Sequence, residues 1–98
     1  MNALRLTGKI VERDTLRYTP AGVAVIEFRV SHESVQTEAG TPRQVDFEVG
    51  AIAIGDASRR ILAAPMGVEL GFEGFLAKRS KQGKTLVLHV TAINASES

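Results

Sequence analysis

The chain has 98 residues, 44% of them hydrophobic, and a formal net charge of only +1 at pH 7. This length fits one small domain over residues 1–98 with a single core. The absence of cysteine excludes disulfide scaffolds and thiolate metal sites, and the two histidines lack the local spacing of a zinc site, so we expect no metal and no cofactor.

The N-terminal segment MNALRLTGKIVER predicts neither a signal peptide nor a membrane anchor. Its charges at Arg5 and Lys9 interrupt the apolar residues, and no run of eighteen apolar residues occurs anywhere in the chain. We therefore expect a soluble, cytoplasmic protein that makes no membrane contact.

Hydrophobic residues recur with a period of two, which is typical of half-buried strands and not of amphipathic helices. Five segments show this period, and each has an apolar set that should face inward. In chain order these sets are Leu4, Leu6, Gly8 and Ile10; Ala24, Ile26, Phe28 and Val30; Val45, Phe47, Val49 and Ala51; Val68, Leu70, Phe72, Gly74 and Leu76; and Leu86, Leu88 and Val90. We place Phe28, Phe47 and Phe72 in the core. Phe75 has the opposite phase and is expected to point outward.

Turn-forming residues separate these segments. TPAG at Thr19–Gly22 and EAGTP at Glu38–Pro42 are both expected to be turns. The longest connection, Gly55–Gly67, has room for one short helical turn, which would start at Asp56 as the N-cap and end at Pro65.

Five short strands with a turn signal about every ten residues, and no long helix, favour an all-β fold. The expected architecture is a five-stranded antiparallel Greek-key barrel, the OB-fold, with at most a short helical turn between strands three and four. SH3-like barrels have similar patterns, so the alternation predicts the class and not the topology. Gly8, Gly71 and Gly74 fit the bends and bulges by which a small barrel turns its corners.

The charge is unevenly distributed along the chain. The last quarter, residues 74–98, has Glu97 as its one acidic residue, and its cations, which crowd a short loop, are Lys78, Arg79, Lys81 and Lys84. OB-folds often bind oligonucleotides with the loops between strands four and five and between strands one and two. The second of these loops carries Arg17 and Tyr18 here. Cations bind phosphate without reading sequence, and exposed aromatic rings stack on unpaired bases. The alternative is a solvated loop that only resists aggregation.

The remaining candidates favour binding over catalysis. Phe75 is expected to stack on bases, to contact a second subunit or to plug one end of the barrel. His89 is expected on a strand face, and His32 at a turn or a subunit contact. Nothing resembles a catalytic pair, so we expect no enzyme.

Three stretches resemble the family of primosomal replication protein N (PriB), a bacterial relative of single-stranded DNA-binding protein. They are the TPAG turn leading into a strand, the segment HESVQTEAG, and GF followed by a basic loop and LVLH. The resemblance spans nearly the whole chain. It implies a homodimeric OB-fold that binds single-stranded DNA and helps the PriA helicase to restart stalled replication forks, with DnaT as a partner where present. By position it implies DNA contacts at Arg17, Phe75, Arg79, Lys81 and Lys84.

Two positions depart from the family pattern. Glu33 stands where the best-known members carry an arginine, and Asp46 stands where they carry a tryptophan on strand three. Both acids should repel phosphate, so we expect DNA binding to be weaker across that face and concentrated in the two loops.

The sequence therefore predicts a nonenzymatic accessory protein of the primosome. Its expected contacts with single-stranded DNA are Arg17, Tyr18, Phe75, Lys78, Arg79, Lys81 and Lys84. One alternative is a protein-interaction module whose basic loop meets an acidic partner. Another is a general single-strand coating protein, which the ending INASES disfavours because it lacks a long acidic or glycine-rich tail. The first strand, ALRLTGKIVE, is a candidate pairing edge for the dimer.

Overall fold

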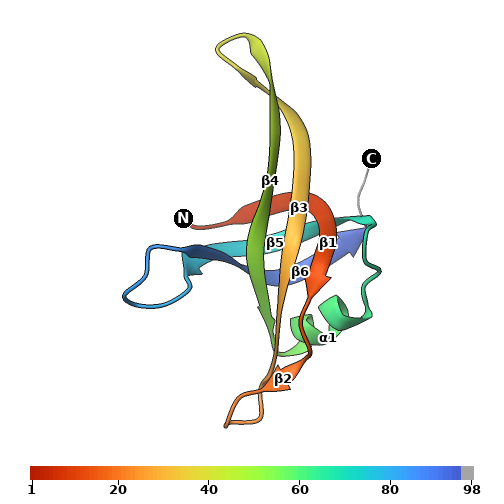
Figure 1. The fold of residues 1–98 in the computed structure, drawn as a ribbon, viewed down its shortest axis with the longest axis vertical. Helices are drawn as coiled ribbons and strands as arrows, with labels where there is room; N and C mark the ends of the chain where they lie inside the picture. The colour runs from red at the N-terminus through yellow and green to blue at the C-terminus, as the bar shows by residue number, and fades with distance from the viewer. Residues whose placement is uncertain (96–98) are drawn as a thin grey trace.

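Strands make up most of the fold, and one short helix lies between the fourth and fifth of them (Figure 1). The computed structural model describes residues 1–95. Its elements are β1 (Leu4–Arg13), β2 (Arg17–Tyr18), β3 (Ala24–Glu38), β4 (Thr41–Ile54), α1 (Asp56–Ala63), β5 (Glu69–Lys78) and β6 (Leu86–Ala95). All five predicted strands are present, and the two-residue strand β2 is an addition that the alternation did not predict.

Five of the strands close into a barrel. The sheet order is β1-β5-β6-β4-β3-β2, and β1 also pairs with β3, which joins the two ends of the five-stranded set. The pairs are antiparallel except for a short parallel contact between β4 and β6 at Ala51 and Ile52. The predicted five-stranded all-β barrel is confirmed, and its antiparallel character holds for every pair but this one.

The core fills the barrel with the inward side chains of all five strands. Phe28, Ala51, Leu88 and Leu76 lie side by side in register, and the ring of Phe28 lies 6.2 Å from that of Phe72. Phe72 is 1% exposed, which makes it one of the largest fully buried side chains. Burying a side chain of this size stabilises a small domain by about 1.5–3 kcal/mol.

Helix α1 covers one end of the barrel and buries Ile61 and Ser58 against it. It spans eight residues, and its N-cap is Gly55, so the prediction that Asp56 is the N-cap is wrong. Gly55 has a φ of 71°, a left-handed conformation that glycine adopts without steric cost, and Asp56 lies in the first turn. The helix ends before Pro65, as predicted. Within residues 1–95, no helix has the length and apolarity to cross a membrane.

β3 and β4 continue beyond the barrel as a two-stranded hairpin, residues 32–47, which we call the arm. It rises to the top of the view in Figure 1. The pairing of β1 with β3 ends at Ser31, so beyond that residue the arm has no third strand against it among the described residues. Its turn at Ala39 and Gly40 has φ angles of 53° and 77°, which confirms the turn predicted from EAGTP.

The arm explains why the core assignment of Phe47 is wrong. Phe47 has the inward phase, but it is 42% exposed because it lies past the closed part of the barrel. Its ring packs on His32, with centroids 4.9 Å apart, and Nδ1 of His32 hydrogen-bonds to the carbonyl of Thr7 at 2.6 Å. Two more residues of the predicted inward sets are exposed: Val68, which precedes β5, and Leu86, the first residue of β6.

A β-bulge interrupts the pairing of β5 with β6 next to Gly74. The register shifts between Glu73 and Gly74, and a Cβ at Gly74 would overlap the carbonyl oxygen of His89. The bulge prediction is therefore confirmed for Gly74. Gly8 and Gly71 lie in regular β1–β5 pairing.

Candidate nucleic-acid interface

One row of outward-facing side chains crosses four strands of the barrel, and we call it the outer row. It consists of Phe75 on β5, His89 on β6, Ile52 on β4 and Glu27 on β3, each in register with the next. Side chains alternate between the two faces of a strand, so the neighbouring row, which contains Phe28, lies in the core. The outer row therefore presents two aromatic rings, an aliphatic group and a carboxylate on one face.

The aromatic end of the outer row is a stacked pair of rings. Phe75 and His89 lie with centroids 4.8 Å apart and an angle of 8° between their planes. Phe75 is 38% exposed, as its phase predicted. A hollow of about 300 Å³ lies beside the pair, with Ile52 and Ile54 in its lining. Flat rings next to an open apolar surface suit a stacked, unpaired base.

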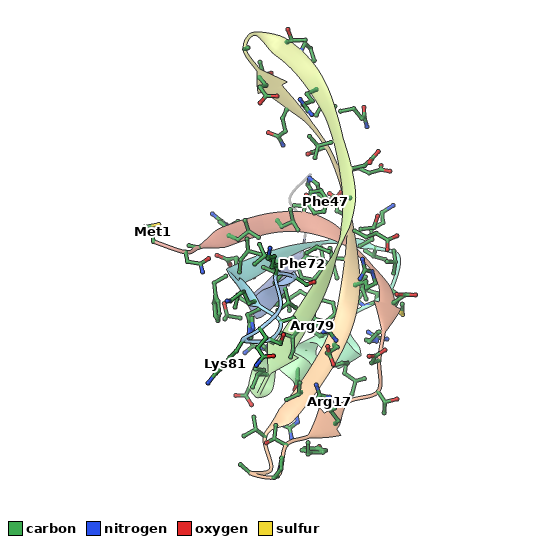
Figure 2. The ribbon with its side chains drawn as sticks, turned by 60° about the vertical axis from the view of Figure 1, so that its left-hand side comes forward. Met1, Arg17, Phe47, Phe72, Arg79 and Lys81 are labelled. Carbon is green, nitrogen blue, oxygen red and sulfur yellow. The ribbon has the colours of Figure 1, made fainter. Side chains whose placement is uncertain are left out.

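The other end of the outer row brings two of the predicted cations together. Arg17, on β2, lies 3.1 Å from one carboxylate oxygen of Glu27, and Arg79, which follows β5, lies 2.6 Å from the other. Both arginine side chains are more than half exposed, whereas Glu27 is 26% exposed. Figure 2 shows Arg17 and Arg79 on the same side of the barrel. The two loops expected to bind nucleic acid therefore meet at one carboxylate.

The basic loop, residues 79–85, holds its lysines away from any ion pair. Its ends are joined by a hydrogen bond from the amide of Arg79 to the carbonyl of Thr85, and Lys78 donates to the carbonyl of Lys81 at 3.3 Å. Lys81 and Lys84 are exposed, and neither forms an ion pair with another residue of the described range. Figure 2 shows Lys81 projecting outward. These two lysines are available for phosphate.

Tyr18 is the predicted site residue that lies on the other face of its strand from Arg17. It is 59% exposed on β2, opposite Ala24, whereas Arg17 lies opposite Val25. Successive residues of a strand point to opposite faces, so Tyr18 points away from the face of Arg17.

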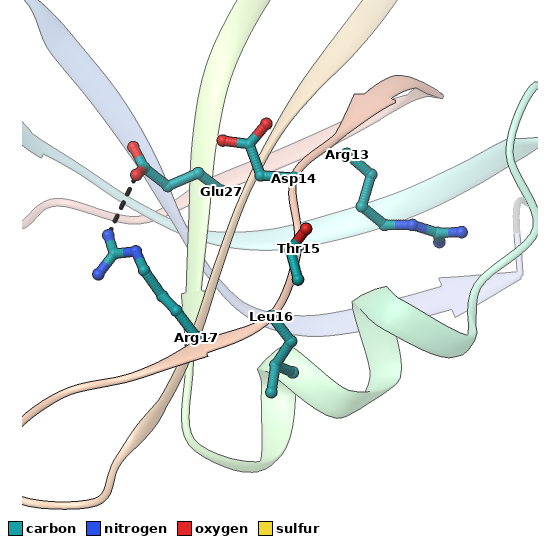
Figure 3. A pocket seen from close by; sticks show the side chains of 6 residues that line it. All are labelled: Arg13, Asp14, Thr15, Leu16, Arg17 and Glu27. Atoms are coloured by element: carbon teal, nitrogen blue, oxygen red, sulfur yellow. Dashed lines mark hydrogen bonds and ion pairs between the residues drawn. The ribbon is translucent and has the colours of Figure 1, made fainter.

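The Arg17–Glu27 pair forms part of the lining of a pocket of about 530 Å³ (Figure 3). Its lining includes Asp14 and Arg13, and Figure 3 shows the Arg13 side chain directed away from Glu27. Arg13 donates to the carbonyls of Ile61 and Ala64, at 2.8 and 2.7 Å, so it anchors the end of α1. Of the arginines that line this pocket, only Arg17 belongs to the candidate interface.

The two acids that depart from the family pattern lie on the arm. Glu33 and Asp46 are directly opposite each other on β3 and β4, both are exposed, and neither has an ion pair within residues 1–95. They share the outward phase of Glu27 but lie farther along the strands, toward the arm tip. Neither acid is neutralised by an ion pair in the described part of the chain, so the repulsion of phosphate predicted from the sequence would act along the arm.

Glu27 and His89 were not predicted as site residues. Their outward phase is visible in the sequence, but the ion pairs of Glu27 and the ring contact of His89 join segments distant in the chain. The one local signal that linked His89 to the site was that it and Phe75 both have the outward phase in their strands. No group of three histidine, aspartate or glutamate residues within residues 1–95 is placed to hold a metal ion.

Comparison with known proteins gives a consistent match over nearly the whole chain. A family model described as "Another single-strand binding protein family" matches residues 2–92. Replication restart protein PriB of Nitrosomonas europaea is 40% identical over 89 residues, which cover 91% of this chain and 82% of that protein. The PriB of Bordetella pertussis is 38% identical over 90 residues, covering 92% of this chain and 84% of the relative.

Solved structures agree with this match. The PriB structure from Ralstonia solanacearum superimposes with a TM-score of 0.88 at 34% identity and covers 99% of both chains. The single-stranded DNA-binding protein from Thermus aquaticus has a TM-score of 0.74 at 22% identity and covers 100% of this chain and 51% of its own, which shows the shared fold alone. The OB-fold prediction is thereby confirmed. The chain belongs to the PriB family of replication restart proteins, and the matching family model is that of a single-strand binding protein family.

Proposed function

We propose that this chain is a nonenzymatic accessory protein of the primosome that binds single-stranded DNA and assists the PriA helicase in restarting stalled replication forks. It would act in the cytoplasm, with DnaT as a further partner where the organism has one. Its membership of the PriB family supports this role. The contacts we assign are Arg17, Phe75, Lys78, Arg79, Lys81 and Lys84, and Tyr18 at the margin.

The observation that carries the proposal is the convergence of Arg17 and Arg79 at one end of the outer row. Cations from two loops meet there, and the stacked rings of Phe75 and His89 lie at the other end. Phosphate binding by arginine and lysine gives affinity without sequence preference, and ring stacking accepts any base. This combination suits an unpaired strand lying across the barrel.

The test is fluorescence anisotropy of a labelled dT oligonucleotide at low and moderate salt. A variant with Arg79, Lys81 and Lys84 changed to alanine removes three cations from the interface. Because each phosphate contact contributes about 0.7 to the slope of log K against log salt, we expect affinity to fall by on the order of a hundredfold and the slope to flatten by about two.

The matched control changes three exposed arginines elsewhere to alanine: Arg43, Arg59 and Arg60. It removes the same net charge, so the long-range electrostatic attraction between protein and oligonucleotide falls equally in both variants. Equal losses of affinity would contradict a specific role for the basic loop. If the wild-type protein does not bind the oligonucleotide at low salt, the single-strand part of the proposal is refuted.

We also propose a homodimer that forms through β1. Residues 4–8 of β1 pair with β5 on one edge, while the pairing with β3 begins only at Lys9. This leaves one edge of residues 4–8 without a strand partner in the described chain, and such edges pair with other chains. Sedimentation equilibrium of the same samples should give twice the mass of the chain, and a monomer at micromolar concentration would contradict it.

A second function has support from the arm. Val35 is exposed there on the same face as the uncompensated acids Glu33 and Asp46, and Phe47 is exposed on the opposite face. An exposed apolar and acidic surface suits a protein partner better than DNA. If oligonucleotide binding proves absent while the protein still binds the helicase, the chain is an interaction module of the primosome.

A further inference from the structure

We propose that Arg17 and Arg79 form a clamp for one phosphate of a single nucleic-acid strand, and that Glu27 occupies this clamp in the free protein. This inference rests on the proposed function, because it assigns the residues that take one phosphate and the residue that competes with it. Glu27 then sets the affinity of the interface without touching the strand.

The two arginines bind different oxygens of the Glu27 carboxylate. Arg17 Nη2 lies 3.1 Å from Oε2 of Glu27, and Arg79 Nη2 lies 2.6 Å from Oε1. Each guanidinium therefore uses its own oxygen, and both point at one anionic group. Arg17 lies on β2 and Arg79 follows β5, so they converge on Glu27 only in the folded chain.

A phosphodiester offers the same pattern of acceptors as this carboxylate. It carries two charged oxygens on one centre, and the planar guanidinium fork binds carboxylate and phosphate alike. The site of the Glu27 carboxylate is thus a place where both arginines already aim at two anionic oxygens. A phosphate that replaces it leaves the hydrogen bonds of the arginines satisfied.

Exposure and position allow the exchange. The side chains of Arg17 and Arg79 are 55% and 59% exposed, so a strand reaches them from solvent without opening the core. Ion pairs at this level of exposure are individually weak, so several other contacts of a bound strand are enough to displace Glu27. Glu27 ends the outer row on β3, so a strand lying across that row from Phe75 arrives at the clamp.

The decisive variant is Glu27→Gln, which keeps the size of the side chain and removes the competing charge. The matched control is Glu48→Gln, which removes the same charge from a carboxylate paired with Arg29 at 3.3 Å, away from Arg17 and Arg79. With a labelled dT oligonucleotide at fixed salt, we expect Glu27→Gln to bind about five times more tightly and Glu48→Gln to change by less than about twofold.

Two further variants separate competition from net charge. Glu27→Asp keeps the charge but is too short to meet both arginines at once, so it should tighten binding by about twofold. Arg79→Ala should cost more affinity in the Glu27→Gln background than in the wild type, because the freed arginine then contributes its full contact with phosphate.

The outcomes are distinguishable. Equal effects of Glu27→Gln and Glu48→Gln, or no change with either, would overturn the clamp. Weaker binding by Glu27→Gln would also overturn it, since Glu27 would then serve only to position the two loops. If neither the wild type nor any variant binds the oligonucleotide at low salt, the proposed function fails, and the clamp fails with it.

Discussion

Strands β3 and β4 run through both the closed barrel and the arm, yet the same alternation of apolar residues leads to full burial only in the barrel. In the barrel, Phe28 is 4% exposed, whereas Phe47, with the same inward phase on the arm, is 42% exposed. The difference begins where β1 stops pairing with β3, at Ser31. Alternation therefore decides which face a side chain takes, and closure of the barrel decides whether that face is buried.

The two regions also differ in charge. The barrel gathers Arg17 and Arg79 at one carboxylate and holds Lys81 and Lys84 free on the basic loop. The arm presents Glu33 and Asp46 with no cation against either in the described chain. Cations attract phosphate and unpaired acids repel it, so we expect a bound strand to follow the barrel and avoid the arm.

The largest expected effect tests the difference in burial. Phe72→Ala removes a fully buried ring from the barrel and should lower the free energy of unfolding by about 3–5 kcal/mol. Phe47→Ala removes a ring that is half in solvent and packs mainly on His32, so it should cost about 1 kcal/mol. Urea unfolding followed by circular dichroism measures both. Similar losses would mean that the arm is covered in solution, for example by a second subunit.

A smaller effect tests the difference in cations. Lys81→Ala should lower affinity for a dT oligonucleotide by about fivefold and flatten the slope of log K against log salt by about 0.7. Arg43→Ala is the control on the arm, because Arg43 already pairs with Glu38 at 3.0 Å near the hairpin turn. Its slope should match that of the wild type. A flatter slope for Arg43→Ala would place the strand along the arm as well.

The smallest effect tests the acids of the arm. Changing Glu33 to Gln and Asp46 to Asn together removes the repulsion that this region exerts on phosphate, and should raise affinity by about twofold at low salt. The gain should vanish at high salt, because exposed charges are then screened. Anisotropy at two salt concentrations measures it. A tenfold gain that survives salt would show that the strand contacts these positions directly.

Local pattern was enough to predict the barrel and most of the basic surface. The alternation located all five long strands, the glycine-containing turns were where TPAG and EAGTP placed them, and the cations of the basic loop are visible in the chain itself. Phe75 was assigned to the outer face from phase alone, and it lies there. These features depend on residues close together in sequence.

The errors came from features that depend on distant residues. Phe47 was placed in the core because a period of two carries no information about where the barrel stops. Glu27 was not assigned to the site, since its two arginines are brought to it only by folding. The cap of α1 was assigned to Asp56, but the sharp bend after β4 needs the left-handed φ of Gly55.

The length of the outer row also predicts how many nucleotides of a single strand one subunit would cover. Neighbouring strands lie about 4.8 Å apart, so a row across four of them measures about 14 Å from Phe75 to Glu27. At about 3.4 Å per stacked nucleotide, this distance corresponds to roughly four nucleotides. We therefore expect one subunit to have a short footprint, with affinity that rises steeply with oligonucleotide length up to that size and more slowly beyond it.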